Sequence, residues 1–283
     1  MQKHRVTENK MIPSSFEYKR ANSVEEAIGL LSEGYAKVLS GGHSLIPTLK
    51  LRLNSPDSLV DIAKIASLKG IKIEGNNLVI GSTTTHQDIA SSDLVKQYFS
   101  LLSEGAGAIG DVQVRNKGTL GGSLAHADPS ADWPALVLAA DATIAMQGEK
   151  GKRMVKADDF FTGFFSTALE EDEIITAIHF PIPEPGTKST YQKFVQPASR
   201  FAIVGCAVVK QPSGKVRVAF SGVSDNAFRD TAVENAVISG KSNEESALSA
   251  AEGISIMSDH YASEEYRKHL AKVYAKRALM AVA

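Results

Sequence analysis

Cysteine is almost absent from this sequence, which has one, Cys206, among 283 residues. A single thiol excludes a disulfide within the chain, and it also excludes any site built from several thiolates of this chain. If the protein works with an iron–sulfur cluster, that cluster therefore has to be held by another polypeptide.

Long apolar runs and a large net charge are also absent. No apolar stretch is long enough to span a bilayer, and residues 1–16 are polar, without the apolar segment of a secretory signal. The 31 basic and 32 acidic residues leave a net charge of −1, so no overall positive field attracts nucleic acid or an anionic membrane. We expect a cytoplasmic protein that neither inserts into a membrane nor binds nucleic acid.

The residues that are present are typical of a globular protein, with 43% hydrophobic and 22% charged side chains over a length that suits two domains. Proline and glycine cluster between residues 181 and 189, which is typical of a linker. We therefore expect one domain over residues 1–182 and a second domain over residues 183–283.

Hydrophobic periodicity and turn residues predict the elements of both domains. Ser23 and Glu26 form a capping-box pattern that starts a helix near residue 24. The first domain is expected to contain strands at 36–39, 59–62, 143–147, 152–156 and 173–179, a hairpin at 68–80, and helices at 86–108, interrupted near residue 92, and at 134–140. The second is expected to contain three antiparallel strands, at 191–195, 202–210 and 215–223, packed with helices from residue 230 onward.

Two glycine pairs with neighbouring hydroxyl side chains are the strongest signs of a binding site. One lies in Ser40-Gly41-Gly42-His43-Ser44, directly after a predicted strand, and the other in Thr119-Leu120-Gly121-Gly122-Ser123. Glycine lets the backbone turn so that several N–H groups point at one oxygen-rich ligand, and two such loops together suit a diphosphate. Neither matches the Walker A or G-x-G-x-x-G pattern, which disfavours a P-loop nucleotidase and a Rossmann dinucleotide site.

Four longer motifs carry a resemblance to a known family. In chain order they are SGGHSLIPTLKLRL, IGSTTTH, IGDVQVRNKGTLGGSLAHADPSADWPA and ADDFFTGFFSTALEEDEI. With these motifs the chain resembles the FAD-binding medium subunit of the molybdenum hydroxylases, the family of carbon monoxide dehydrogenase, xanthine dehydrogenase and related aldehyde and glyceraldehyde oxidoreductases. The resemblance implies an α+β fold. Its first domain would be an FAD-binding domain of the vanillyl-alcohol oxidase type, made of two α/β subdomains split near residue 65, and a small domain of a three-stranded antiparallel sheet and helices would follow.

The resemblance also implies where the cofactor lies. The first glycine loop would bind the FAD pyrophosphate through backbone N–H groups, and the second would approach the diphosphate and ribitol. Asp132 falls where the family has a carboxylate that contacts FAD, and Tyr191 is a candidate for the aromatic residue beside the flavin. Lys193 falls near the pyrimidine edge, where an ammonium group stabilises negative charge on a reduced flavin. The implied cofactor-binding residues are Ser40, Gly41, Gly42, His43, Ser44, Leu45, Ile109, Thr119, Leu120, Gly121, Gly122, Ser123, Asp132, Leu169 and Lys193.

FAD is expected to be bound non-covalently. Some covalent flavoproteins of the same broad fold attach the flavin to a histidine in a similar loop, but the motif around His43 is that of the molybdenum hydroxylases. No metal site is expected, since His86 and His126 lack further ligands at metal-binding spacing. Asp128 precedes a proline and is interpreted as a turn residue rather than as one half of an acid–base pair with Asp132. No catalytic residue is assigned to this chain.

The function that the resemblance implies is electron transfer within a larger enzyme. FAD on this chain would take electrons from [2Fe-2S] clusters on a small subunit and pass them to an external acceptor. A large subunit would oxidise an aldehyde or related small molecule at a molybdopterin centre, and the family implies a dimer of such heterotrimers. Two alternatives stay open: a stand-alone flavin oxidase or dehydrogenase of the same fold, and a non-catalytic FAD-binding module.

Overall fold

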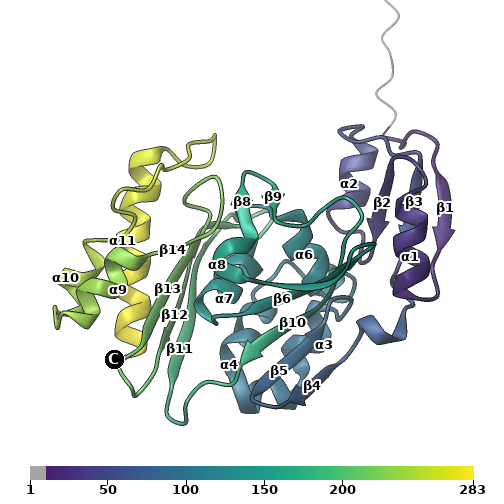
Figure 1. Ribbon diagram of the computed structural model, residues 1–283. Helices are drawn as coiled ribbons and strands as arrows, with labels where there is room; N and C mark the ends of the chain where they lie inside the picture. The colour runs from purple at the N-terminus through teal and green to yellow at the C-terminus, as the bar shows by residue number, and fades with distance from the viewer. Residues whose placement is uncertain (1–10) are drawn as a thin grey trace, which may run out of the picture.

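The computed structural model describes residues 11–283, so most of the N-terminal stretch in which we found no secretory signal lies outside the described residues. Three larger sheets follow one another along the molecule, from the N-terminal elements at one end to the C-terminal helices at the other (Figure 1). Over the described residues, no helix combines the length and the apolar character needed to cross a bilayer.

The N-terminal part is a small parallel sheet whose central strand is buried along its whole length. The sequence predicted two of its strands, but it did not predict the first strand or the short helix after the glycine loop. The elements are β1 (Glu17–Arg20), α1 (Val24–Leu31), β2 (Ala36–Leu39), α2 (Leu45–Lys50) and β3 (Ser58–Asp61), in the strand order β1-β3-β2.

Helix α1 begins where its capping residues predict. The Ser23 hydroxyl accepts a hydrogen bond of 3.0 Å from the Glu26 N–H, and the Glu26 carboxylate accepts one of 2.7 Å from the Asn22 N–H. The buried side chains of α1 have the spacing of one helical face, which packs on the sheet. They are Val24, Ala27, Ile28 and Leu31.

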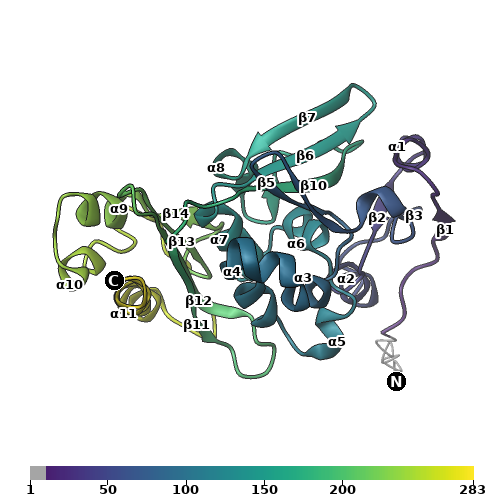
Figure 2. The same ribbon diagram turned by 90° about the horizontal axis from the view of Figure 1, so that it is seen from below.

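The middle part is a five-stranded antiparallel sheet with helices beside one face (Figure 2). Its central strand β10 comes late in the chain and pairs with one strand from each of two earlier hairpins. The predicted hairpin and the predicted interruption of the long helix are both present. In chain order the elements are η1 (Ala66–Leu68), β4 (Ile71–Glu74), β5 (Asn77–Gly81), α3 (His86–Ser91), α4 (Asp93–Gly107), α5 (Val112–Arg115), α6 (Leu120–His126), α7 (Asp132–Ala139), β6 (Thr143–Gly148), β7 (Gly151–Lys156), α8 (Ala157–Phe160), β8 (Phe161–Gly163), β9 (Ser166–Thr167) and β10 (Ile174–Pro181), with the sheet order β4-β5-β10-β6-β7.

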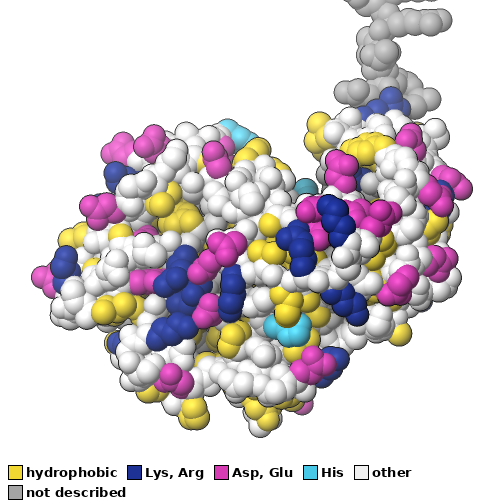
Figure 3. Space-filling model, viewed as in Figure 1, with side chains coloured by type: hydrophobic (Ala, Val, Ile, Leu, Met, Phe, Trp, Pro, Cys, Tyr) yellow, Lys and Arg dark blue, Asp and Glu magenta, His cyan; other side chains and the backbone are white. Residues whose placement is uncertain are grey.

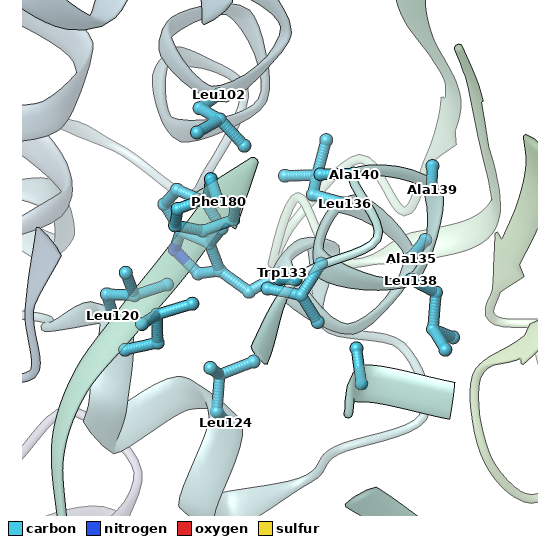
Figure 4. Packing of buried hydrophobic residues seen from close by; sticks show 14 of the residues in the cluster. Leu102, Leu120, Leu124, Trp133, Ala135, Leu136, Leu138, Ala139, Ala140 and Phe180 are labelled. Atoms are coloured by element: carbon cyan, nitrogen blue, oxygen red, sulfur yellow. The ribbon is translucent and has the colours of Figure 1, made fainter. Parts of the chain in front are cut away.

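Helix α7 is buried at every one of its residues, from Asp132 to Ala139. A helix that is apolar all round belongs in a core rather than on a surface. Trp133 is fully buried and lies among leucines of α4 and α6 and beside Phe180 of β10 (Figure 4). The same buried cluster includes Tyr191 of the C-terminal sheet, so the middle and C-terminal parts share one core.

The C-terminal part is an antiparallel sheet with helices on the face turned away from α7 (Figure 1). The three predicted strands are present, and a two-residue fourth strand at the sheet edge was not predicted. Strand β12 is buried over nearly its full length, because α7 contacts one of its faces and α11 the other. The elements are β11 (Lys188–Val195), β12 (Ala202–Lys210), β13 (Val216–Ser221), β14 (Phe228–Arg229), α9 (Thr231–Ile238), α10 (Asn243–Ala247) and α11 (Glu264–Ala281).

A buried arginine fastens the last helix to this sheet. Arg267 on α11 is 1% exposed, and its guanidinium donates to the carbonyl oxygens of Ile203 and Gly222 and to the Asp259 carboxylate. Gly222 has a left-handed backbone, with φ 77°, and its own N–H donates to the carbonyl of Pro129 in the middle part at 2.7 Å. Arg267 thus satisfies carbonyl groups that the sheet leaves without a partner.

Replacing this arginine tests how much the contact stabilises the fold. We expect Arg267→Ala to lower the free energy of unfolding by about 3 kcal/mol or more, because buried carbonyl groups and Asp259 lose their donor. Lys268→Ala, at an exposed neighbour on the same helix, is the control and should change the free energy by less than about 0.5 kcal/mol. Denaturant unfolding followed by circular dichroism measures both, and equal losses in the two variants would contradict the role given to Arg267.

Candidate functional site

A cleft of about 490 Å³ is lined by residues from the N-terminal, middle and C-terminal parts. Figure 3 shows a notch at the top of the molecule, between the lobe that carries α1 and α2 and the larger lobe. The cleft walls are formed by β2 and the loop before α2, by residues of α3 and α6, and by part of the loop after β11. The predicted cofactor residues that line it are Ser40, Gly41, Gly42, His43, Ser44, Leu45, Ile109, Thr119, Gly121, Gly122, Ser123, Asp132 and Leu169.

Two of the predicted cofactor residues do not line this cleft. Leu120 is fully buried in the core, in the same cluster as Trp133 (Figure 4). Lys193 lies behind the cleft wall, where its side chain is 5% exposed and bonded to Asp132. Neither side chain is part of the cleft lining.

The two glycine segments meet at Gly41. A Cβ atom built on Gly41 would lie 2.1 Å from the carbonyl oxygen of Lys117 and 2.9 Å from the Cα of Gly118. Only glycine permits backbones to approach this closely. The hydroxyls of Ser40 and Thr119 share a hydrogen bond of 3.0 Å beside the contact. The structure thus brings segments that are almost eighty residues apart to one cleft.

The first glycine loop presents a run of backbone donors. The N–H groups from Gly41 to Leu45 donate to no acceptor within residues 11–283. Gly42 has φ 74°, a left-handed conformation that turns the chain between β2 and α2. Successive N–H groups around such a turn form a concavity that binds anions. A phosphate group is the kind of ligand that would satisfy them.

The second glycine segment is not the loop that we expected, because helix α6 begins within it. The Thr119 hydroxyl caps this helix by accepting an N–H of its first turn at 3.3 Å. The N–H groups of Leu120 and Gly121 donate to the carbonyl oxygens of Thr84 and Ser82, at 3.1 and 2.8 Å. Since these donors are used inside the protein, the segment offers the cleft small residues and hydroxyl groups rather than a second set of N–H groups.

A buried carboxylate faces the cleft at the start of α7. Asp132 is 5% exposed; Lys193 Nζ donates to it at 2.8 Å and the Tyr191 hydroxyl at 2.5 Å. Lys193 also donates to the Ala108 carbonyl at 3.2 Å. Burial raises the pKa of Asp132, and the Lys193 ammonium counteracts this rise. Tyr191, our candidate for the aromatic residue beside the flavin, lies behind Asp132, and burial holds its pKa well above the usual value.

His86, which we expected only to start a helix, also lies on the cleft wall. It follows the N-cap residue Thr85, is 5% exposed, and its Nδ1 accepts a hydrogen bond of 3.0 Å from Trp133 Nε1. Burial, followed by the nearby His43 and Arg115, lowers the pKa of His86 to about 4. The imidazole is therefore neutral at pH 7.

Other residues of the cleft wall behave as predicted or were missed. Asp128 is the expected turn residue, since its carboxylate accepts the Ser130 N–H at 2.8 Å. His126, expected in a loop close to the cofactor, instead ends α6 on the cleft wall, with its ring edge-on to Phe165. The segment 199–201, from the loop between β11 and β12, also reaches the cleft. That loop carries no motif, so only the tertiary fold reveals its place.

The three-part fold and a donor-rich loop at its central cleft are those of a nucleotide-binding flavoprotein. A family model described as "FAD binding domain in molybdopterin dehydrogenase" matches residues 14–183, and one described as "CO dehydrogenase flavoprotein C-terminal domain" matches residues 189–282. The chain belongs to this family, the FAD-binding medium subunits of the molybdenum hydroxylases. It is thus an oxidoreductase flavoprotein subunit whose cofactor is FAD, which confirms the resemblance read from the motifs.

Curated relatives cover nearly the whole chain. The carbon monoxide dehydrogenase medium chain of Hydrogenophaga pseudoflava is 40% identical over 96% of this chain and 98% of its own length. The glyceraldehyde dehydrogenase medium chain of Sulfolobus acidocaldarius is 38% identical over 96% of this chain and all of its own. The xanthine dehydrogenase FAD-binding subunit of Escherichia coli is 30% identical over 93% of this chain and 94% of its own.

Solved structures share the fold. Carbon monoxide dehydrogenase from Hydrogenophaga pseudoflava has a chain that superposes with a TM-score of 0.92 at 40% identity, over 96% of this chain and 98% of that one. Quinoline 2-oxidoreductase from Pseudomonas putida has one with a TM-score of 0.88 at 29% identity, over 95% of this chain and 97% of that one. These matches confirm the predicted α+β architecture, an FAD-binding domain followed by a C-terminal domain.

The contact at Gly41 gives a test of the cleft. We expect Gly41→Ala to weaken FAD binding at least about tenfold and to lower the free energy of unfolding by about 1–3 kcal/mol, because the new methyl group overlaps the Lys117 carbonyl. Gly29→Ala in α1 is the matched control: its Cβ meets nothing within 4 Å, and it should stabilise the helix by up to about 1 kcal/mol. Flavin fluorescence titration and chemical unfolding measure the two effects. Unchanged FAD affinity in Gly41→Ala would show that the close approach is not needed.

His86 predicts a loss of stability in acid. Its folded pKa is about 4 and that of an unfolded histidine is about 6.5, so between these values the unfolded state binds more protons. The free energy of unfolding should therefore fall as the pH is lowered from about 6.5 to 4, by up to about 1.4 kcal/mol per pH unit from this group. Above about pH 6.5 the histidine is neutral in both states and should contribute no pH dependence. Chemical unfolding at several pH values measures the slope. His86→Gln should remove this share, and an identical slope in that variant would contradict the assignment.

Proposed function

We propose that this chain is the electron-transfer subunit of a heteromeric molybdenum hydroxylase. Its FAD would take electrons from [2Fe-2S] clusters on a small subunit and pass them to an external acceptor. A large subunit would oxidise an aldehyde or related small molecule at a molybdopterin centre, and two such three-chain units would form a dimer. The observation that carries the proposal is the run of N–H donors at Gly41–Leu45, in a chain whose full-length relatives are medium chains of such dehydrogenases.

The residues of the cleft fit FAD. Five consecutive N–H groups without a protein acceptor among residues 11–283 suit the oxygen atoms of a diphosphate, which needs fixed donors more than positive charge. The apolar side chains of Ile109 and Leu169 suit an aromatic ring system, and the cleft volume of about 490 Å³ is typical of a cofactor site. When bound, FAD supplies the redox chemistry; the protein supplies position and electrostatics.

Lys193 would act on the cofactor through Asp132. The ammonium group bonds to the carboxylate at 2.8 Å behind the cleft wall, so it neutralises Asp132 and fixes its orientation. Asp132 then presents an acceptor of fixed position to the cleft. Lys193 near the pyrimidine edge stays a prediction; its side chain is not among the residues that line the cleft.

Further expectations concern the thiol of Cys206, the domain boundary, the location of the protein and the attachment of FAD. Cys206 is buried in β12, so its thiol is not available to a cluster or a metal. The division into domains at residues 1–182 and 183–283 stays a prediction, beside family models that match residues 14–183 and 189–282. A cytoplasmic location and non-covalent FAD stay predictions.

The absorption spectrum of the purified full chain is the first test. We expect flavin bands that pass into the supernatant on acid precipitation and chromatograph as FAD, because no bond to the protein is expected. Flavin in the pellet would instead indicate attachment at His43 and favour a stand-alone oxidase. A colourless chain that takes up no added FAD would overturn the proposal.

Reduction of the bound flavin separates the proposed subunit from its alternatives. We expect substrate to bleach the flavin only when the large and small subunits are added to this chain. Bleaching by a substrate without partner subunits would indicate a stand-alone flavin enzyme. A flavin that stays oxidised in the complete complex with substrate would indicate a module that holds FAD without electron transfer.

A further inference from the structure

We propose that His86 is a further binding residue for the diphosphate of FAD: its neutral imidazole donates the Nε2–H to a phosphate oxygen held by the Gly41–Leu45 loop, and Trp133 fixes the tautomer that makes this possible. The inference rests on the proposed function, because it concerns FAD bound in this cleft.

The tautomer follows from the hydrogen bond to Trp133. An indole nitrogen is a donor only, so Nδ1 of His86, which lies 3.0 Å from Trp133 Nε1, has to be the acceptor. A neutral imidazole with Nδ1 as acceptor carries its proton on Nε2. Trp133 is fully buried in the core, so the indole cannot turn away from this contact.

The Nε2 atom lies next to the donor loop. A Cβ atom built on Gly118 would be 2.7 Å from His86 Nε2, and the Cα of Gly118 is 2.9 Å from a Cβ position built on Gly41. One glycine therefore separates the imidazole from the first residue of the loop, and both His86 and Gly41 line the same cleft. The backbone holds this arrangement, because the His86 N–H donates to the Gly118 carbonyl at 3.0 Å.

The Nε2–H has no acceptor within the part of the chain that the structure describes, although His86 is 95% buried, being 5% exposed. The Nε2 atom keeps some accessible surface although the residue as a whole is buried, so an oxygen atom of a ligand in the cleft can accept from it. The titratable groups that act on the pKa of His86 are His43 and Arg115, and neither of them is an anion. An anionic ligand is therefore the partner that the surroundings of His86 favour.

Two amide substitutions separate the two hydrogen bonds of His86. The oxygen of asparagine replaces Nδ1 as the acceptor for Trp133, but its amide nitrogen is too short to reach the Nε2 position. The amide nitrogen of glutamine replaces Nε2, but the side chain leaves Trp133 without its acceptor. His86→Asn thus keeps the core contact and loses the donor to the cleft, while His86→Gln does the reverse.

We expect His86→Asn to raise the dissociation constant for FAD about 10–100-fold, as loss of a hydrogen bond to a charged group would. His86→Gln should stay within about threefold of the wild type. Fluorescence titration of the flavin-depleted full chain with FAD measures both, and thermal unfolding checks that both variants fold. A purely structural role predicts the opposite order, and either that order or equal affinities would overturn the inference.

A spectroscopic measurement on the wild type does not depend on the variants folding. Long-range ¹H–¹⁵N correlation of the histidine-labelled chain should show the Nε2–H tautomer for His86, and adding FAD should move that proton signal downfield. The Nδ1–H tautomer, or a signal that FAD leaves unchanged, would overturn the inference alone. A wild-type chain that binds no FAD at all would instead overturn the proposed function.

Discussion

The cleft depends on the close approach of Gly41 to the backbone of Lys117 and Gly118. No side chain separates the two segments there, and the hydroxyls of Ser40 and Thr119 hold them in register. Because the junction is made of backbone, the N–H groups that follow Gly41 remain open to the cleft instead of being covered. A single steric constraint therefore joins the N-terminal part to the middle part and leaves an anion-binding surface between them.

The C-terminal part belongs to the same site through the shared core. Helix α7 is buried between the middle helices and the C-terminal sheet, and its first residue, Asp132, is the carboxylate on the cleft wall. A carboxylate this deeply buried needs a partner, which Lys193 and Tyr191 supply from strand β11. Strand β11 thus sets the charge of Asp132 at the cleft, although neither Lys193 nor Tyr191 lines the cleft itself.

Local sequence signals sufficed where neighbouring residues determine the structure. The cap of α1 at Ser23 and the hairpin of β4 and β5 need only near contacts, and both were predicted. Strand β1 was missed because its side chains are mostly exposed and give no alternating pattern. Helix α6 was interpreted as a loop because glycines disfavour helices by about 1 kcal/mol each relative to alanine. The tertiary packing requires glycine at position 121, because a Cβ atom there would lie 2.5 Å from the side chain of Ser82.

By itself the sequence determined the family, the need for any iron–sulfur cluster to lie on another chain, and the two segments that border the cleft, because motifs and a cysteine count carry this information directly. Only the tertiary structure decided which groups in those segments are available to a ligand. The N–H donors of α6 are taken up by Thr84 and Ser82, while those after Gly41 are not. Trp133, 47 residues away, donates its indole N–H to Nδ1 of His86 and so leaves the imidazole proton on Nε2. Hydrogen-bond partners that distant leave no mark in a local pattern, so the fold alone assigns them.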